Sequence, residues 1–148
     1  MALGDRAHGG RDALTQLDDL GGTLRNISTD LTNVEVPQPV DSFEVTGMTE
    51  TRKSYIPGQI DNPVTITGNM NAGTALNAAH KVLSAINGVS TATFSFEHYP
   101  AGSASGKPKL SGEVFCLGYT VRAPLGGGVT FDASLMPANS TGLVWSTV

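Results

Sequence analysis

The short glycine-rich segment GSASG, residues 102–106, is the part of this 148-residue chain closest to a known catalytic motif. A hydrolase that uses the G-x-S-x-G pattern places its nucleophilic serine at the third position, and Ala104 stands there instead. The surrounding residues are proline, glycine and lysine, which are typical of a loop and not of a strand that leads into a helix. The segment is therefore predicted to be a connecting loop without a nucleophile.

The other potentially reactive residues also have simple structural explanations. His8, His80 and His98 lie far apart, and none has a cysteine, histidine or carboxylate at the spacing of a metal site. Residues 126–128 are three glycines without the Lys-Ser/Thr of a phosphate loop, so a hairpin turn is expected. Residues 18–19 are two aspartates at an expected turn, where aspartate is favoured. We predict no enzyme activity, metal, cofactor or small-molecule substrate.

Charge and composition narrow the class of protein further. Nine basic and thirteen acidic residues give a net charge of −4, and the basic residues are not clustered as tight phosphate binding requires. No apolar run approaches the roughly 20 residues of a membrane helix, so no membrane partner is expected. Cys116 is the single cysteine, which excludes an internal disulfide and favours cytosolic synthesis. Eighteen glycines and eight prolines favour strands and turns.

Alternating apolar and polar residues predict about eight strands. The strand at 110–123 has apolar residues on both faces and is expected to be central in its sheet. The other predicted strands lie near residues 13–17, 23–28, 33–36, 64–70, 91–99, 129–135 and in the final segment LVWSTV.

One helix is predicted, at about residues 74–87. Thr74 is a suitable N-cap, and Gly88 stands where a helix end needs a left-handed residue. The apolar face of this helix is formed by Leu76, Ala79, Leu83 and Ile86.

A long extended loop is predicted at about residues 38–58. It contains charged residues, but also several apolar side chains that need a surface to rest on. Loops of this length in a compact domain are usually functional or disordered. Pro57 and Gly58 are expected to form a tight turn into the next strand. One interpretation of these apolar side chains is a lid that folds back over the protein's own core.

These elements predict a mainly β fold, an antiparallel β-sandwich or barrel with one flanking helix. Residues 1–12 are glycine-rich, charged and aperiodic, so they are expected to form a flexible N-terminal arm. Residues 13–148 are expected to form a single domain.

Three segments, in order, resemble the major tail tube protein of long-tailed (siphovirus-type) bacteriophages. The resemblance covers roughly residues 10–148, and its most specific part is the succession R-[DN]-I-S, K-x-Y-I-P-G-x-x-D and H-Y-P-x-G. The segments are GGTLRNISTDLTNVEVPQPVD, then TRKSYIPGQIDNPVTITGN, then EHYPAGSASGKPKLSGEVFCLGY with VTFDASLMPANSTGLV.

This resemblance implies a tail-tube β-barrel domain at residues 13–148, related in fold to the tube proteins of type VI secretion. It also implies a structural virion protein that self-assembles into stacked hexameric rings. These rings form the hollow tube of a long non-contractile tail, through which viral DNA is ejected. The implied partners are other copies of the chain, the tape-measure protein and the tail-terminator protein, whereas DNA passes without specific binding. The implied location is the virion tail, assembled in the cytoplasm of the host bacterium.

Candidate site residues follow from the resemblance. Six subunits of charge −4 would place about −24 on each ring, and an acidic lumen would let DNA slide without sticking. Glu113 and Asp132 are the candidate lumen acids. The candidate intersubunit residues of the long loop are Phe43, Val45, Met48, Tyr55, Pro57 and Gly58.

Two other functions remain alternatives. One is the tube protein of a contractile tail or secretion machine, which only an associated sheath would distinguish. The other is a β-sandwich carbohydrate-binding or adhesion module. Such modules usually display exposed aromatic platforms, whereas most of the nine aromatic residues here stand at core-patterned positions.

Overall fold

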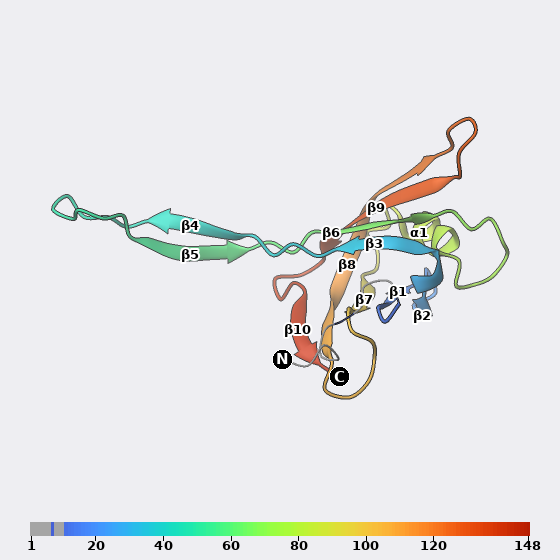
Figure 1. The fold of residues 1–148 in the computed structure, drawn as a ribbon, viewed down its shortest axis with the longest axis horizontal. Coiled ribbons are helices and arrows are strands. Elements are labelled where there is room, and N and C mark those ends of the chain that lie inside the picture. The colour runs from blue at the N-terminus through green and yellow to red at the C-terminus, as the bar shows by residue number, and fades with distance from the viewer. Residues whose placement is uncertain (1–6, 8–10) are drawn as a thin grey trace.

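The body of the protein is an antiparallel β-sheet of eight strands, and a two-stranded β-hairpin projects from one end of it (Figure 1). This computed structural model describes residue 7 and residues 11–148. The arm predicted at residues 1–12 therefore lies, apart from residues 7, 11 and 12, outside the described residues. The mainly β, antiparallel fold with one helix agrees with the sequence prediction, although the sheet does not close into a barrel.

The strands of the body follow the order β2-β1-β7-β8-β9-β6-β3, and β10 pairs with β8. The long strand β8 is central, as its two-sided apolar pattern predicts. The strands are β1 (Leu14–Asp18), β2 (Leu24–Asn26), β3 (Leu31–Glu35), β6 (Val64–Asn69), β7 (Phe94–Tyr99), β8 (Pro108–Arg122), β9 (Thr130–Pro137) and β10 (Val144–Thr147).

Strand β8 belongs to both layers of a sandwich-like body. Its first part pairs with β7 up to Val114 and with β10 at 108–111, whereas its second part pairs with β9 from Val114 to Arg122. The strand passes from one layer to the other near Val114, where the β7 ladder ends and the β9 ladder begins, and its register with β9 shifts two residues later, between Cys116 and Gly118. Strands β9, β6 and β3 continue the second layer.

The apolar core lies between the two layers and is covered by helix α1 (Ala79–Ile86). The strict alternation along β9 buries Phe131, Ala133 and Leu135, as the sequence predicts. The rest of the core is formed by Leu17, Ile27, Val64, Ile66, Ala79, Val82, Leu83, Ile86, Phe94, Phe96, Leu110, Val114, Cys116 and Leu143.

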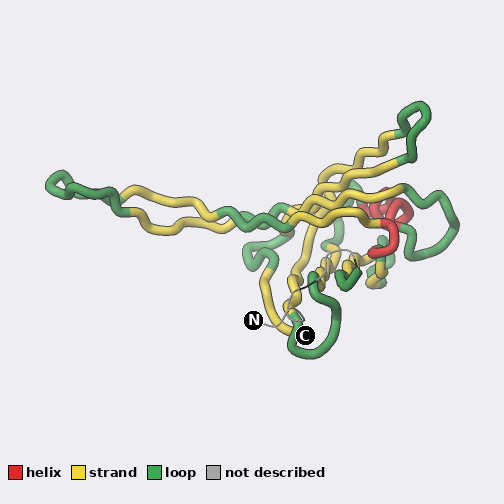
Figure 2. The backbone as a smooth tube through the Cα atoms, viewed as in Figure 1, coloured by secondary structure: helices red, strands yellow, loops and turns green. Residues whose placement is uncertain are grey.

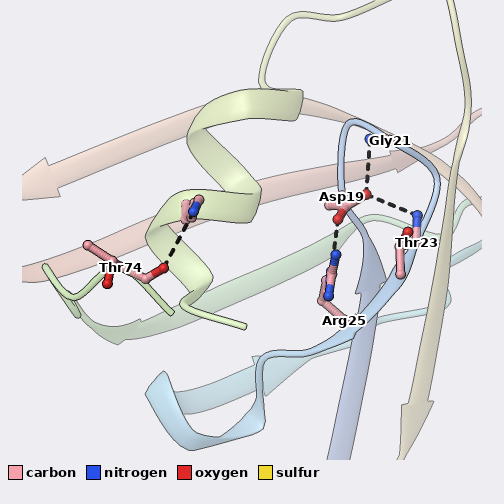
Figure 3. Close-up of polar contacts among 6 residues, drawn as sticks. Asp19, Gly21, Thr23, Arg25 and Thr74 are labelled. Atoms are coloured by element: carbon pink, nitrogen blue, oxygen red, sulfur yellow. Dashed lines mark hydrogen bonds and ion pairs between the residues drawn. The ribbon is translucent and has the colours of Figure 1, made fainter. Parts of the chain in front are cut away.

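Helix α1 begins five residues later than the predicted start at Thr74, which was wrong. Its first turn is capped from outside: the Ala79 amide donates to Asp30 Oδ2 at 2.8 Å. Asp30 belongs to the 3₁₀ helix η2 (Ser28–Asp30), and its carboxylate also suits the positive end of the helix dipole. Thr74 lies in the preceding loop, and its carbonyl accepts a bond from Lys81 Nζ at 3.4 Å (Figure 3).

Of the other two predictions for the helix, the one for Gly88 is confirmed and the one for Leu76 was wrong. Gly88 has a φ of 76°, the left-handed conformation expected just past the helix end. Leu76 was expected on the apolar face, but it lies before the helix and is exposed.

The turn between β1 and β2 is organised by one carboxylate, that of Asp19 (Figure 3). Its Oδ1 accepts from the amides of Gly21 and Thr23, each at 2.9 Å, and its Oδ2 accepts from Arg25 Nε at 2.8 Å. The bond from the Thr23 amide, followed by that from Arg25, lowers the pKa of Asp19. The sequence-based prediction that this aspartate has a structural role in a turn is confirmed.

The extended connection predicted at 38–58 is present, and its two arms pair as the strands β4 (Val40–Glu44) and β5 (Tyr55–Ile60). Figures 1 and 2 show this hairpin standing away from the body. The predicted Pro57-Gly58 turn was wrong, because both residues lie inside β5 and the chain reverses at residues 45–54. A two-stranded ribbon tolerates proline, since each strand has an outer edge that needs no donor.

Candidate assembly surfaces

The first face of the β4–β5 hairpin, which we call face A, is formed by Phe43, Val45, Ile56 and Gly58. Phe43 pairs directly with Ile56, and alternation places Val45 and Gly58 on the same side. A Cβ built on Gly58 would lie 2.6 Å from Phe43 Cε2, so only glycine leaves room for the ring in this position. The three apolar side chains of this face are exposed.

The opposite face, face B, is also apolar. Val40 pairs with Ile60 at the base, beyond a register shift, and Tyr55 and Pro57 follow on the same side. Val40, Tyr55 and Ile60 are exposed. At the hairpin tip, Met48 is fully exposed. Isolated two-stranded hairpins are marginal in water, and large exposed apolar patches mark interaction sites.

Few described contacts hold the hairpin to the body. Trp145 Nε1 donates to Gln38 Oε1 at 3.0 Å beside the hairpin base. Asn62, just after the hairpin, accepts from the Leu143 amide at 3.3 Å, and its Nδ2 has no partner among the described atoms. A hollow of about 640 Å³ lies here, between the base and β10. The hairpin therefore projects, and the alternative of a lid over its own core is excluded for this chain (Figure 1).

The body carries two further groups of exposed apolar side chains, at different ends of strand β8. We call the first the tip group, because it extends from the bulge in the middle of β8 to the β8–β9 turn, and the second the C-terminal group. The tip group is Leu117, Val121, Leu125 and Val129, and the C-terminal group is Val144, Trp145 and Val148.

Several strands have an open edge within the described residues, and two of these edges belong to the layer β3-β6-β9-β8. Strand β3 pairs with β6 alone. On the side of β8 away from β9, the ladder with β7 ends at Val114, and a single bridge joins Asn87 to Cys116. Beyond Cys116 this side of β8 has no strand partner in the part of the chain that the structure describes. Such edges are templates for pairing with another chain.

The outer face of the layer β3-β6-β9-β8 is polar over most of its area. Asp132 lies there and forms an ion pair with Arg122. Glu113 lies on the same side of β8 nearer its start, where it accepts from Ser95 Oγ at 2.7 Å. Register assigns to this face Asn33, Glu35, Thr65, Thr67, Asn69, Thr120, Arg122, Thr130, Asp132 and Ser134, with Phe115 and Met136 at one end.

The residues first considered for catalysis have ordinary positions. His98 is buried and its Nδ1 lies 2.9 Å from Thr15 Oγ1; burial lowers the pKa of this histidine. His80 Nδ1 lies 2.6 Å from the Tyr119 hydroxyl. The segment 102–106 is an exposed loop between β7 and β8, and 126–128 belong to the β8–β9 turn, as predicted.

Within residues 7 and 11–148 no three potential metal ligands cluster, and none of the helices found there has the length and hydropathy to cross a membrane.

No protein-family model and no curated protein sequence match this chain. Solved structures do match it. A structure of the SPP1 tail tube has a TM-score of 0.74 at 11% identity, covering 97% of this chain and 80% of that one. The tail of an empty gene transfer agent particle has a TM-score of 0.69 at 13% identity, covering 96% and 99%. The sheath–tube complex of an extracellular contractile injection system gives 0.66 at 12% identity, covering 99% and 95%. The chain therefore has the fold found in tail tubes and related injection systems.

Proposed function

We propose that this chain is the structural subunit of a bacteriophage tail tube. The observation that carries the proposal is the projecting hairpin, whose apolar faces have no partner in the chain's own body. A surface of one copy that fits a different surface of the next makes a heterologous contact, which repeats into rings or filaments. The tail-tube fold supports the same conclusion.

The open sheet edges explain how copies would close into a ring. The exposed edge of β3 in one subunit would pair with the exposed part of β8, beyond Cys116, in the next. Each subunit has one edge of each kind on the same layer, so the pairing continues from copy to copy. The gene transfer agent tail has C6 symmetry, which supports rings of six.

The polar outer face of the layer β3-β6-β9-β8 would line the tube, because it has few apolar side chains to bury. Asp132 and Glu113 keep their proposed place on this face. Arg122 neutralises the charge of Asp132, so the repulsion of DNA from the wall would come from the remaining acids, Glu35 among them. A lumen of mainly hydroxyl and amide groups offers DNA no clustered cations.

The remaining partners and the location are part of the proposal. The sheath/tube terminator of an extracellular contractile injection system and the tube-terminating cap of the anti-feeding prophage are similar to this chain, which supports a terminator protein at the tube end. A tape-measure protein and then DNA would occupy the lumen. The protein would belong to the virion tail after assembly in the host cytoplasm.

The experiment is assembly of the purified chain, followed by negative-stain microscopy and light scattering over a range of concentrations. We expect hollow tubes or stacked rings above a threshold concentration. A chain that stays monomeric at all concentrations, with or without a preformed tube end as nucleus, contradicts the proposal.

A tube inside a contractile sheath is the second candidate, favoured by the match to the sheath–tube complex. Co-purification of a sheath protein with native tails would decide for it. Tails that contain tube subunits and no sheath decide for the non-contractile type.

A further inference from the structure

The hollow between the hairpin base, the β9–β10 connection and β10 is lined by neutral polar groups. Its volume of about 640 Å³ falls within the roughly 300–1,000 Å³ of small-molecule sites. None of the described residues that line it has an ionisable side chain. Half of the lining residues have amide or hydroxyl side chains, namely Gln38, Gln59, Asn62, Asn139, Ser140 and Thr141.

Asn62 has a hydrogen-bond donor that the fold does not use. Its side chain lines the hollow but is only 5% exposed, and its Oδ1 accepts from the Leu143 amide at 3.3 Å. Its Nδ2 has no partner within the described residues. A buried amide that lacks a partner is unfavourable, so such groups in native proteins call for an explanation. An acceptor oxygen that enters the hollow beside Asn62 would supply the partner that the chain itself lacks.

The turn that forms one wall of the hollow is fixed in place by its own hydrogen bonds. Asn139 Oδ1 accepts from the Thr141 amide at 3.1 Å, and the Asn139 carbonyl accepts from the Gly142 amide at 3.2 Å. The side chains of Ser140, Thr141 and Gln59 form no hydrogen bond within residues 7 and 11–148. Their donors and acceptors are therefore available to a ligand, and a wall already in place reduces the entropy lost on binding.

The apolar part of the hollow contains Trp145, whose indole is held at one edge. Its Nε1 donates to Gln38 Oε1 at 3.0 Å, while its side chain stays exposed. Ile60 and Leu143 also line the hollow. An aromatic ring fixed in this way offers an apolar surface beside a set of neutral hydrogen-bonding groups.

We propose that this hollow binds a neutral saccharide. Sugar hydroxyls both donate and accept hydrogen bonds, as do the amides and hydroxyls of the lining, and the C–H groups of a sugar ring can pack on Trp145. An anionic ligand finds no counter-charge here. The apolar surface of another copy would leave the polar lining buried without partners. The inference goes beyond the proposed tube function and does not depend on it.

Fluorescence of the full chain, kept below its assembly threshold, tests the proposal. Trp145 is the only tryptophan, so its emission reports on the hollow. The probes are the methyl glycosides of glucose, galactose, mannose and N-acetylglucosamine, with glycerol as the neutral control and glucose 6-phosphate as the anionic one. At least one glycoside is expected to change the emission with half-saturation on the order of 1 mM and to protect Trp145 from acrylamide quenching. In NMR spectra, the Asn62 side-chain amide signals should shift in the same titration.

Substitutions in the lining test the location of the bound sugar. Thr141→Val and Gln59→Ala each remove one exposed hydrogen-bonding group, so each should weaken binding by about three- to tenfold. Thr51→Val, in the hairpin turn, is the matched control and should bind as the unmodified chain does. All three variants should keep the melting temperature, since none of these side chains belongs to the core.

The outcomes separate this inference from the tube function. No saturable response to any of the four glycosides overturns it, and protection of Trp145 on polymerisation alone would then assign the hollow to contacts between copies. Equal effects of Thr141→Val and Thr51→Val, or an unmoved Asn62 amide, would also overturn it, because the sugar would then bind elsewhere. Each of these failures leaves assembly into tubes untouched, and a chain that binds sugar without polymerising would refute only the tube function.

Discussion

Replacing Gly68 by alanine should be among the most damaging small changes to this fold. Gly68 lies in β6, between Leu31 of β3 and Phe131 of β9. A Cβ at this position would lie far inside contact distance of the Asp30 carbonyl oxygen and 2.8 Å from Phe131 Cζ. Because the contact with the Asp30 carbonyl oxygen is with backbone, a side-chain movement cannot remove the clash. The segment formed by η2 and β3 would have to move away from β6.

The size of the effect follows from these contacts. Overpacking of a close-packed interior typically costs about 1–3 kcal/mol. Movement of Asp30 would also weaken its bond to the Ala79 amide, and the loss of a helix cap costs about 1 kcal/mol. We therefore expect Gly68→Ala to lower the free energy of unfolding by about 2–4 kcal/mol.

Urea denaturation followed by far-ultraviolet circular dichroism, below the assembly threshold, measures this value. The matched control is Gly128→Ala: a Cβ there meets no atom within 4 Å, and the expected change is within about 0.5 kcal/mol. Equal stabilities of the two variants would refute the close approach of β3 to β6 on which the estimate depends.

Three further predictions concern the helix cap, the hairpin and pH. Asp30→Ala should destabilise the protein by about 1 kcal/mol and speed amide exchange in the first turn of α1; unchanged exchange there would exclude Asp30 as the cap. Gly58→Ala should displace the Phe43 ring and raise the threshold concentration for tubes without changing the melting temperature, and a lower melting temperature would show that the hairpin belongs to the core. Because burial lowers the pKa of His98 below its ordinary 6.5, the unfolded chain binds its proton first, so stability should fall as the pH falls through about 6.5. His98→Gln should lose this component in urea titrations above and below that pH, and an unchanged pH dependence would show that other groups are responsible.

The features that could be predicted from the sequence were those that depend on residues close together in the chain. Alternation gave the buried face of β9, the two-sided apolar pattern gave the central place of β8, and Gly88 marked the end of the helix. The start of the helix was not predictable in this way, because its cap comes from Asp30, which lies 49 residues earlier in the chain. A threonine at the usual cap position was a misleading local signal.

The candidate assembly surfaces were also predictable only in part, because some of their features depend on residues that are distant in sequence. The apolar residues of the 38–58 segment were identifiable as lacking a place in the core, but their division between two faces depends on the pairing of β4 with β5. Pro57 and Gly58 suggested a turn because the dipeptide usually forms one. In the structure Gly58 instead makes room for an aromatic ring across the ribbon, which only the pairing partner reveals.

The passage of β8 through both layers has a mechanical consequence. Strand β8 is one continuous segment of 15 residues, which pairs with β10 at its first end and with β9 along its second part. In the proposed tube, a pulling force along β8 would be carried by its peptide bonds and by the hydrogen bonds that join it to β10 and β9. These bonds would be loaded in shear, so many of them would have to break together. Such a subunit would resist stretching while its two ends still bent relative to each other at the bulge after Cys116.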